Sequence, residues 1–165
     1  MEAKMQTETE TKISSKYIKT PVGKFWVEAD GNKIDSLSFV KKGRKFPRPK
    51  DNGFDFSVLE KQLKEYFEGI RTEFNLPLNW DKPQKFHKRV LKELNKVPYG
   101  KTLSYKELAI LAGSPKASRA VGQVMAKNPF PIVVPCHRVL ASSGKLGGYG
   151  GGLDVKVRLL ELEKS

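Results

Sequence analysis

The chain of 165 residues contains a single cysteine, Cys136. One cysteine forms neither an intramolecular disulfide nor a zinc site built from several cysteines, so neither kind of link can hold this fold together. Hydrophobic residues make up 38% of the sequence, enough to bury a core in one generous domain or two small ones. A lone cysteine fits a reducing compartment, and the sequence has neither an apolar run of membrane-spanning length nor a signal peptide. We therefore expect a cytoplasmic protein that does not contact a membrane.

The residues around Cys136 favour a reactive thiol over a small buried hydrophobe. Residues 131–134 are apolar and β-branched, which predicts a buried strand that Pro135 ends. Cys136 then lies where the strand becomes a turn or a helix, beside His137 and Arg138, and such surroundings lower the pKa of a thiol. Neighbouring side chains of a strand point to opposite faces, so the imidazole would act on the thiol through one water and would need a carboxylate to orient it. The alternatives are an inert buried cysteine and a structural core histidine.

The charge of the chain is strongly positive and uneven. The formal net charge is +13; residues 1–83 contain 16 Lys and Arg against 13 Asp and Glu, whereas residues 84–165 contain 15 against 5. This balance favours a polyanionic partner, nucleic acid above all, bound by the second half. A basic surface that only serves solubility is the alternative.

The first half predicts an α/β unit over residues 13–80, after a disordered polar tail at residues 1–12. Residues 15–40 alternate in the manner of strands, and Asp-Gly-Asn at residues 30–32 signals a hairpin turn. Residues 41–55 are basic and contain Gly, Pro and Asn, which predicts a loop.

A helix is expected after this loop. Ser57 and Glu60 have the spacing of a capping box, and the helix should end near Gly69. Two prolines within residues 76–83 predict a linker to a second unit, residues 81–165.

The second half is predicted to be mainly helical. Residues 86–94 repeat their apolar positions with helical spacing. Ser104 and Glu107 have the spacing of another capping box, and the helix that they open should bury Leu108 and Leu111.

A second short helix is expected soon after. Ser114 should cap it, with Pro115 in the first helical position, and it should end at residues 128–129. The two helices form a helix-turn-helix candidate, although helical hairpins are common in α-rich domains. Residues 144–152 contain six glycines, a composition that suits a plain loop or one that closes over a ligand, and residues 155–163 predict an amphipathic helix.

Several of these motifs, in order, strongly resemble the O6-alkylguanine-DNA alkyltransferase family. They are Pro-Cys-His-Arg-Val at residues 135–139, Asn-Pro at 128–129 before it, and Gly-Tyr-Gly at 148–150 after it. The resemblance covers the chain from about residue 86 to its end and extends more loosely to the first half. It implies a ribonuclease-H-like α/β domain, with a small antiparallel sheet plus a helix, followed by a mainly helical domain with a winged-helix-like helix-turn-helix.

The function that this resemblance implies is DNA repair. Members flip O6-alkylguanine out of duplex DNA and transfer its alkyl group irreversibly to their own cysteine; O4-alkylthymine is a poorer substrate. The expected partner is double-stranded DNA with an alkylated guanine, bound by a monomer that needs no cofactor.

The resemblance also assigns roles to residues. Cys136 matches the nucleophile, His137 the water-linked base, and Glu163 the carboxylate that orients the base. Tyr105 matches the tyrosine that protonates the leaving guanine and helps to rotate the target phosphate; an unperturbed phenol, with a pKa of about 10, keeps that proton available. Arg119 matches the residue that fills the gap left by the flipped base. Further residues of the DNA-binding helix are Lys116, Ala117, Ala120 and Gln123, and those of the substrate pocket are Met125, Asn128, Pro131, Val139, Tyr149, Gly150 and Lys156.

Some positions depart from relatives. Gly150 stands where many relatives have a serine near O6, and the first half lacks the cysteines with which some relatives bind zinc, so no metal site is expected. Two other functions remain open from the residues alone: a DNA-binding regulator whose cysteine is a sensor or core residue, and a thiol hydrolase that turns over repeatedly.

Overall fold

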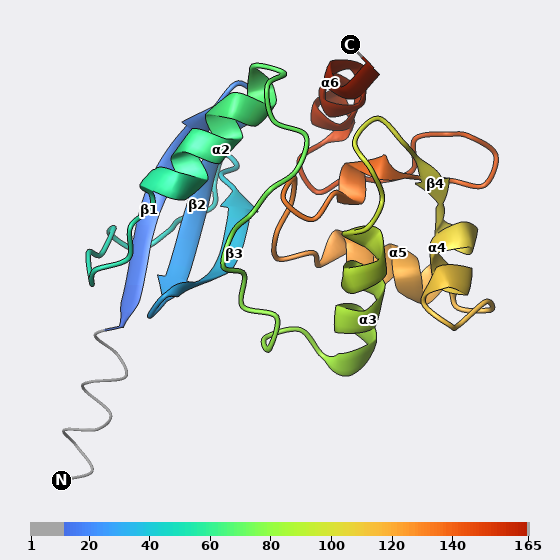
Figure 1. Cartoon of the computed structure of the whole chain (residues 1–165), viewed down its shortest axis with the longest axis horizontal. Helices are drawn as coiled ribbons and strands as arrows, with labels where there is room; N and C mark the ends of the chain where they lie inside the picture. Colours follow the sequence, from blue (N-terminus) through green and yellow to red (C-terminus); the bar gives the residue numbers. More distant parts are fainter. Residues whose placement is uncertain (1–11, 165) are drawn as a thin grey trace, which may run out of the picture. The chain divides into compact units, whose positions relative to one another are not determined.

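The computed structural model describes residues 12–164, which divide into two compact units between Asn79 and Trp80 (Figure 1). Most of the predicted tail at residues 1–12 lies outside the described residues. Each unit is built differently: the first around a sheet, the second around helices. Within residues 12–164, every helix is too short or too polar to cross a membrane.

The first unit contains three antiparallel strands, β1 (Ile13–Thr20), β2 (Gly23–Asp30) and β3 (Lys33–Phe39), in that order in the sheet. The predicted hairpin is confirmed, because Asp30 pairs with Lys33 across Gly31 and Asn32. Helix α2 (Ser57–Phe67) lies across one face of the sheet (Figure 1). Alternation along the strands sends one set of side chains towards this helix, where they form the apolar core with Leu59, Leu63 and Tyr66.

The start of α2 differs from the prediction. Ser57 is the first helical residue, and the N-cap position is held by Phe56, so the Ser57–Glu60 capping box is wrong. The preceding Asp55 caps the helix instead, because its Oδ1 accepts a hydrogen bond from the Ser57 N–H at 2.9 Å. Glu60 binds Lys16 Nζ of β1 at 2.6 Å. The helix ends before Gly69, as predicted.

The second unit contains three helices packed on one another, α3 (Lys85–Leu94), α4 (Tyr105–Leu111) and α5 (Ser118–Ala126). Two short strands, β4 (Leu103–Ser104) and β5 (Val139–Leu140), pair in parallel. A 3-10 turn, η1 (Cys136–Arg138), precedes β5, and α6 (Leu153–Lys164) closes the unit.

The capping box of α4 is confirmed. Ser104 Oγ accepts from the Glu107 N–H and the Glu107 carboxylate accepts from the Ser104 N–H, both at 3.0 Å. The burial of Leu111 was wrongly predicted: its side chain is 56% exposed, and Ala109 is buried beside Leu108 instead.

The start of α5 also differs from the prediction. The helix begins at Ser118 with Ala117 as its N-cap, so Ser114 does not cap it. Residues 114–117 form a turn closed by a hydrogen bond from the Ala117 N–H to the Ser114 carbonyl. The hydroxyl of Ser114 accepts from Arg89 of α3 at 2.9 Å and so ties this turn to α3.

Candidate active site

The segment before Cys136 is a turn and not the predicted strand. Ile132 has a φ of 72°, a left-handed conformation that is rare for a β-branched residue. Asn128 holds the turn together: its Oδ1 accepts from the Phe130 N–H and its Nδ2 donates to the Val134 carbonyl, both at 2.9 Å. Because residues 130–134 are all buried, apolar content here reflects burial and gives no information about backbone shape.

Cys136 opens the turn η1 and is buried. The expectation of a lowered thiol pKa is wrong for this structure: burial raises the pKa of Cys136 to about 11. A hydrogen bond from Asn128 and the positive charge of Lys156 oppose that rise but do not overcome it. In the resting protein the cysteine is therefore a protonated thiol, which reacts slowly with oxidants and alkylating agents in solution.

A buried charge network begins at the next residue. His137 Nε2 and Glu163 Oε2 are 2.6 Å apart, and Glu163 also accepts from Arg138 Nε at 2.8 Å and from Arg138 Nη2 at 3.0 Å. Arg138 Nη1 donates to the Val97 carbonyl at 2.7 Å. Burial lowers the pKa of His137, and the Glu163 carboxylate acts in the opposite direction. The imidazole is thus neutral at physiological pH and able to accept a proton.

Lys156 of α6 fixes the glycine-rich segment. Its buried Nζ donates to the Val139 carbonyl at 2.7 Å, to the Gly148 carbonyl at 3.2 Å, and to the Leu146 carbonyl. The three carbonyls satisfy a buried cation that no carboxylate has to neutralise. Lys156 thus ties residues 146 and 148 of the glycine-rich segment to β5 and α6.

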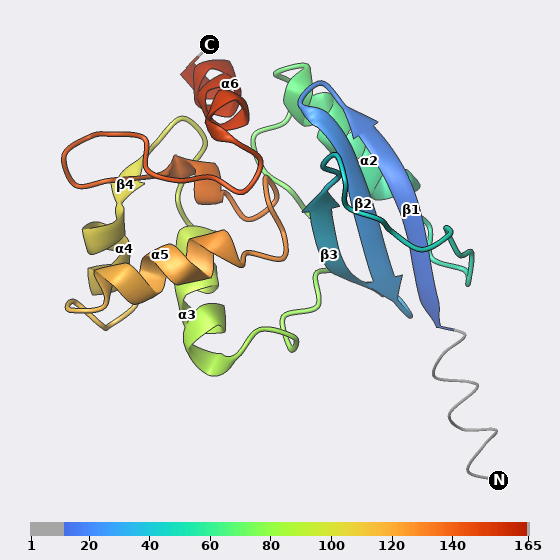
Figure 2. The ribbon, with the colours of Figure 1, turned by 180° about the vertical axis from the view of Figure 1, so that it is seen from behind.

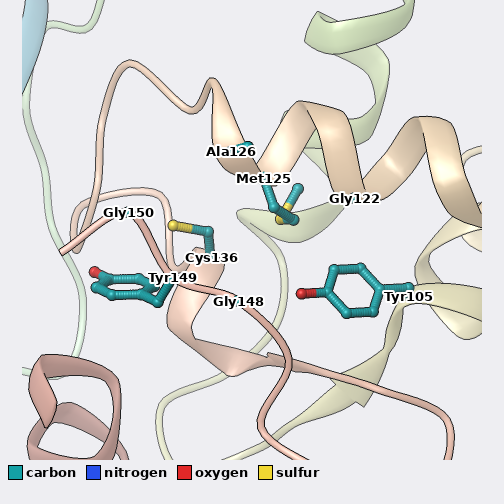
Figure 3. Close-up of a pocket in the computed structure, with 8 residues that line it drawn as sticks. All are labelled: Tyr105, Gly122, Met125, Ala126, Cys136, Gly148, Tyr149 and Gly150. Atoms are coloured by element: carbon teal, nitrogen blue, oxygen red, sulfur yellow. The ribbon is translucent and has the colours of Figure 1, made fainter. Parts of the chain in front are cut away.

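A cavity of about 340 Å³ lies in front of the thiol (Figure 3). Figure 3 shows the rings of Tyr105 and Tyr149 on either side of it, with the hydroxyl of Tyr105 directed inward. The volume falls within the range of small-ligand pockets. The lining residues are Tyr105, Gly122, Met125, Ala126, Cys136, Gly148, Tyr149 and Gly150.

Tyr105, the first residue of α4, is held in a close fit. Burial raises the pKa of Tyr105, and a hydrogen bond with the backbone of Gly148 acts in the opposite direction, so the phenol keeps its proton. A Cβ atom built on Gly147 would come within 2.8 Å of the Tyr105 hydroxyl. The glycine is therefore required for the tyrosine to occupy this place.

Some residues assigned from the sequence line the cavity, and others stand behind it. Met125, Tyr149 and Gly150 line it with Cys136 and Tyr105. The remaining predicted pocket residues belong to the framework that holds Cys136: Asn128 and Pro131 in the preceding turn, and Val139 with its Lys156 partner.

Sequence reasoning missed three lining positions, Gly122, Ala126 and Gly148. Gly122 and Ala126, with Met125 between them, have helical i, i+3, i+4 spacing, and this signal could have placed them on one face of α5. Arg119, Ala120 and Gln123 are exposed on α5, where Arg119 and Gln123 adjoin the lining residues on the helix surface; Lys116 is exposed just before the helix, and Ala117 is half-buried as the N-cap. Within residues 12–164, no group of three His, Cys, Asp or Glu side chains could hold a metal ion.

Both halves of the chain match described protein families. Residues 13–80 match the ribonuclease-like domain, and residues 85–165 the DNA binding domain, of 6-O-methylguanine DNA methyltransferase. The chain is 40% identical over 151 residues to the methylated-DNA–protein-cysteine methyltransferase of Methanosarcina barkeri, covering 90% of this chain and 95% of that protein. It is 41% identical over 157 residues to the protein of that name from Mycobacterium bovis, covering 93% of each. The crystal structure of Mycobacterium tuberculosis OGT in complex with DNA is similar, with a TM-score of 0.82, 42% identity, and coverage of 91% and 92%.

Proposed function

The chain belongs to the 6-O-methylguanine DNA methyltransferase family, and on this premise we propose that Cys136 is the residue that takes the alkyl group. The protein repairs DNA: it transfers the alkyl group of O6-alkylguanine to its own cysteine. The observation that carries the assignment is the cavity in front of Cys136, which is the single cysteine of the chain. A guanine stacked in a duplex cannot reach a buried sulfur, so the base must leave the stack before the reaction.

The first step of the reaction is a proton transfer. Cys136 gives its proton through one water to His137, which is neutral before the reaction, and Glu163 stabilises the resulting imidazolium at 2.6 Å. The thiolate is thus made inside the closed site, next to the substrate, although it is scarce in the resting protein. The hydrogen bond from Asn128 and the charge of Lys156 stabilise it there.

The second step exchanges two bonds. The sulfur of Cys136 attacks the alkyl carbon, the S–C bond forms, and the electron pair of the breaking C–O bond goes to the guanine. Tyr105 donates its proton to the leaving base, and its raised pKa keeps that proton in place until then. The thioether has no path back to a thiol, so each molecule reacts once.

The DNA-binding side of this proposal is a helix-turn-helix made of α4 and α5, in a winged-helix-like domain. Its second helix lines the cavity and exposes Arg119 and Gln123 on the adjoining part of its surface, so a single helix reaches both the substrate and the duplex. Arg119 takes the place of the flipped base, and Lys116 contacts backbone phosphates. The small side chains of Ala117 and Ala120 allow the helix to approach the groove closely. A monomer and a cytoplasmic location complete the proposal; a thiol nucleophile has to stay reduced.

Intact mass measurement tests the assignment. The protein is incubated with a duplex that carries one O6-methylguanine, and the modified peptide is mapped. One added methyl group on the Cys136 peptide, with guanine left in the DNA and no second turnover, is the expected result. Cys136→Ser should bind the duplex and gain no methyl group. A folded, reduced protein that binds the duplex without any mass change would point to a DNA-binding regulator, and repeated turnover would point to a hydrolase.

The role of Arg119 needs a matched pair of variants. Arg119→Ala should slow methyl transfer from duplex DNA and leave transfer from the free O6-methylguanine base unchanged, because the free base needs no extrusion. Arg158→Ala removes an exposed arginine from α6 and should change neither rate. Equal duplex rates for both variants would remove Arg119 from the extrusion step.

A further inference from the structure

We propose that the first unit carries a second contact for duplex DNA, made by the loop of residues 41–50 with Lys19 and Lys24 of the sheet. We call this surface the basic platform. It would bind backbone phosphates and has no part in base recognition or chemistry. The proposal rests on DNA being the substrate of the protein, as argued above.

The charge of the first half is concentrated in this loop. Residues 41–50 contain six Lys and Arg and no Asp or Glu, whereas the rest of residues 1–83 contains ten against 13. The half therefore has a single strongly positive segment on an otherwise slightly acidic chain. Charge that served only solubility would have no need to gather in one place.

The loop is fixed to the sheet at three points. At its start, the Val40 N–H donates to the Lys24 carbonyl at 2.9 Å, and at its end Lys50 exchanges backbone hydrogen bonds with Ser15 at 2.8 and 3.2 Å. Between them, the ring of Phe46 stacks on Trp26 with 5.4 Å between centroids. Figure 2 shows the segment between β3 and α2 crossing the sheet face opposite α2.

Two of the cations are held by this aromatic cluster. The guanidinium of Arg44 lies 4.7 Å from the centroid of the Phe46 ring, and Lys24 Nζ lies 5.3 Å from that of Tyr17, whose ring contacts both Trp26 and Phe46. Charges that are already positioned lose less conformational entropy when an anion binds. The cluster thus orders the cations and leaves their charged ends in solvent.

The cations of the loop have no carboxylate partners. None of the six cationic side chains of residues 41–50 pairs with a carboxylate of the described chain, and all six residues are exposed. Glu28, on the same face, accepts from the indole N–H of Trp26 at 2.9 Å. Lys19 and Lys24 stand directly opposite each other across β1 and β2, an arrangement that costs stability unless an anion lies between them.

The covered rings indicate which polyanion fits. Trp26 is 2% exposed, and Tyr17 and Phe46 are half-buried against it, so the cluster offers little ring surface to an unstacked base or to a lipid core. What remains is a row of fixed cations at the surface, which suits the phosphates of an intact duplex.

Two double variants with the same net charge test the platform in the full chain. Lys45→Gln with Arg48→Gln removes two charges from the loop without touching Phe46 or Arg44. Lys61→Gln with Lys64→Gln removes two exposed charges from α2, on the other side of the sheet. Affinity for an undamaged duplex is measured against salt concentration, together with methylation of Cys136 by the free O6-methylguanine base.

The loop variant should lower the slope of log affinity against log salt by about 1 to 2, since each lost phosphate contact removes about 0.9. The α2 variant should leave the slope unchanged, and both should react with the free base as the parent does. Equal slopes for the two variants would overturn the platform while leaving the repair function intact. A parent protein that never methylates Cys136 would instead overturn the proposed function. Loss of binding to phosphatidylserine vesicles in the loop variant, with an unchanged DNA slope, would overturn the proposal in favour of a membrane surface.

Discussion

The two units bury different kinds of side chain. In the first, the core of sheet and α2 is almost entirely apolar; its buried polar residues are Ser14, Ser15, Asp35 and Gln62, and only one of these carries a charge. The second buries His137, Arg138, Lys156 and Glu163 around Cys136.

This difference separates stability from chemistry. An apolar core gains free energy from each buried group, whereas a buried charge costs free energy unless its partners are well placed. The second unit accepts that cost in the one place where a proton has to move. The first unit therefore has the core of a conventional scaffold, and the second holds the buried charges of the reactive site.

Removing the charge of Glu163 should have the largest effect. Glu163→Gln leaves Arg138 buried without its counter-charge, so the free energy of unfolding should fall by about 3–5 kcal/mol. Methyl transfer should slow by at least about a hundredfold, because the imidazolium loses its stabilising partner. Urea unfolding and single-turnover rates measure the two effects. Glu161→Gln, an exposed change on the same helix, should leave both almost unchanged, and a Glu163→Gln protein as stable as its parent would erase the contrast between the units.

A cavity in the first unit should lower stability without touching the chemistry. Leu63→Ala removes a fully buried side chain from α2 and should cost about 2–5 kcal/mol in unfolding free energy. The folded variant should still react with the free O6-methylguanine base at the parental rate. Lys64→Ala, the exposed neighbour, is the control for α2. A slower free-base reaction for Leu63→Ala alone would mean that the scaffold takes part in the chemistry.

The thiol should make stability depend on pH. The pKa of Cys136 is about 11 in the folded protein against 9.0 for an ordinary cysteine, so the folded state favours the protonated form. Its contribution is fully present below pH 9 and is lost as the pH rises towards 11; at pH 10.5 the loss is about 2 kcal/mol. The free energy of unfolding is measured in urea at pH 7 and pH 10.5 for the parent and for Cys136→Ala. The difference between the two proteins isolates the thiol, because all other groups titrate in both. A difference between the two proteins that stays constant over this range would show that the thiol is not desolvated.

Methylation of Cys136 should lower stability by an amount similar to the effect of pH. A methyl group added to the buried sulfur of Cys136 overfills a packed site, which costs about 1–3 kcal/mol. The melting temperature of the methylated protein should fall by a few degrees for each kcal/mol. Scans of the protein before and after reaction with the free base provide the comparison. Identical melting curves would mean that the cavity absorbs the methyl group without strain.

The sequence predicted correctly those turns and helix caps that are determined by interactions between residues close together in the chain. Asp30-Gly31-Asn32 predicted the hairpin because the turn needs those residue types, and Ser104 with Glu107 predicted a cap that closes within four residues. Ser57 and Ser114 have similar signals, but Asp55 and Arg89 compete for the same groups, and only the structure shows which partner wins.

The geometry of the site could not be predicted in full, because it depends on contacts between residues that lie far apart in the sequence. The run at residues 131–134 was predicted as a strand because burial and β-branching look the same in a turn; Ile132 takes its left-handed conformation because the side chain of Asn128 over-determines the turn. The raised pKa of Cys136 was missed for a related reason: charged neighbours are visible in a sequence and desolvation is not. His137 and Glu163, 26 residues apart, could be paired only through the family resemblance.

The glycine-rich segment has a consequence for how the protein tolerates sequence drift. Its glycines are not equivalent: Gly147 has a φ of +70° and would clash with Tyr105 if it gained a side chain, whereas Gly148 and Gly150 have open space at the Cβ position. A library that randomises the segment and is selected for repair should therefore return glycine at 147 and varied residues at 150. The first position maintains the reaction, and the second is free to reshape the range of adducts that the repair reaction accepts, without disturbing the machinery beside it.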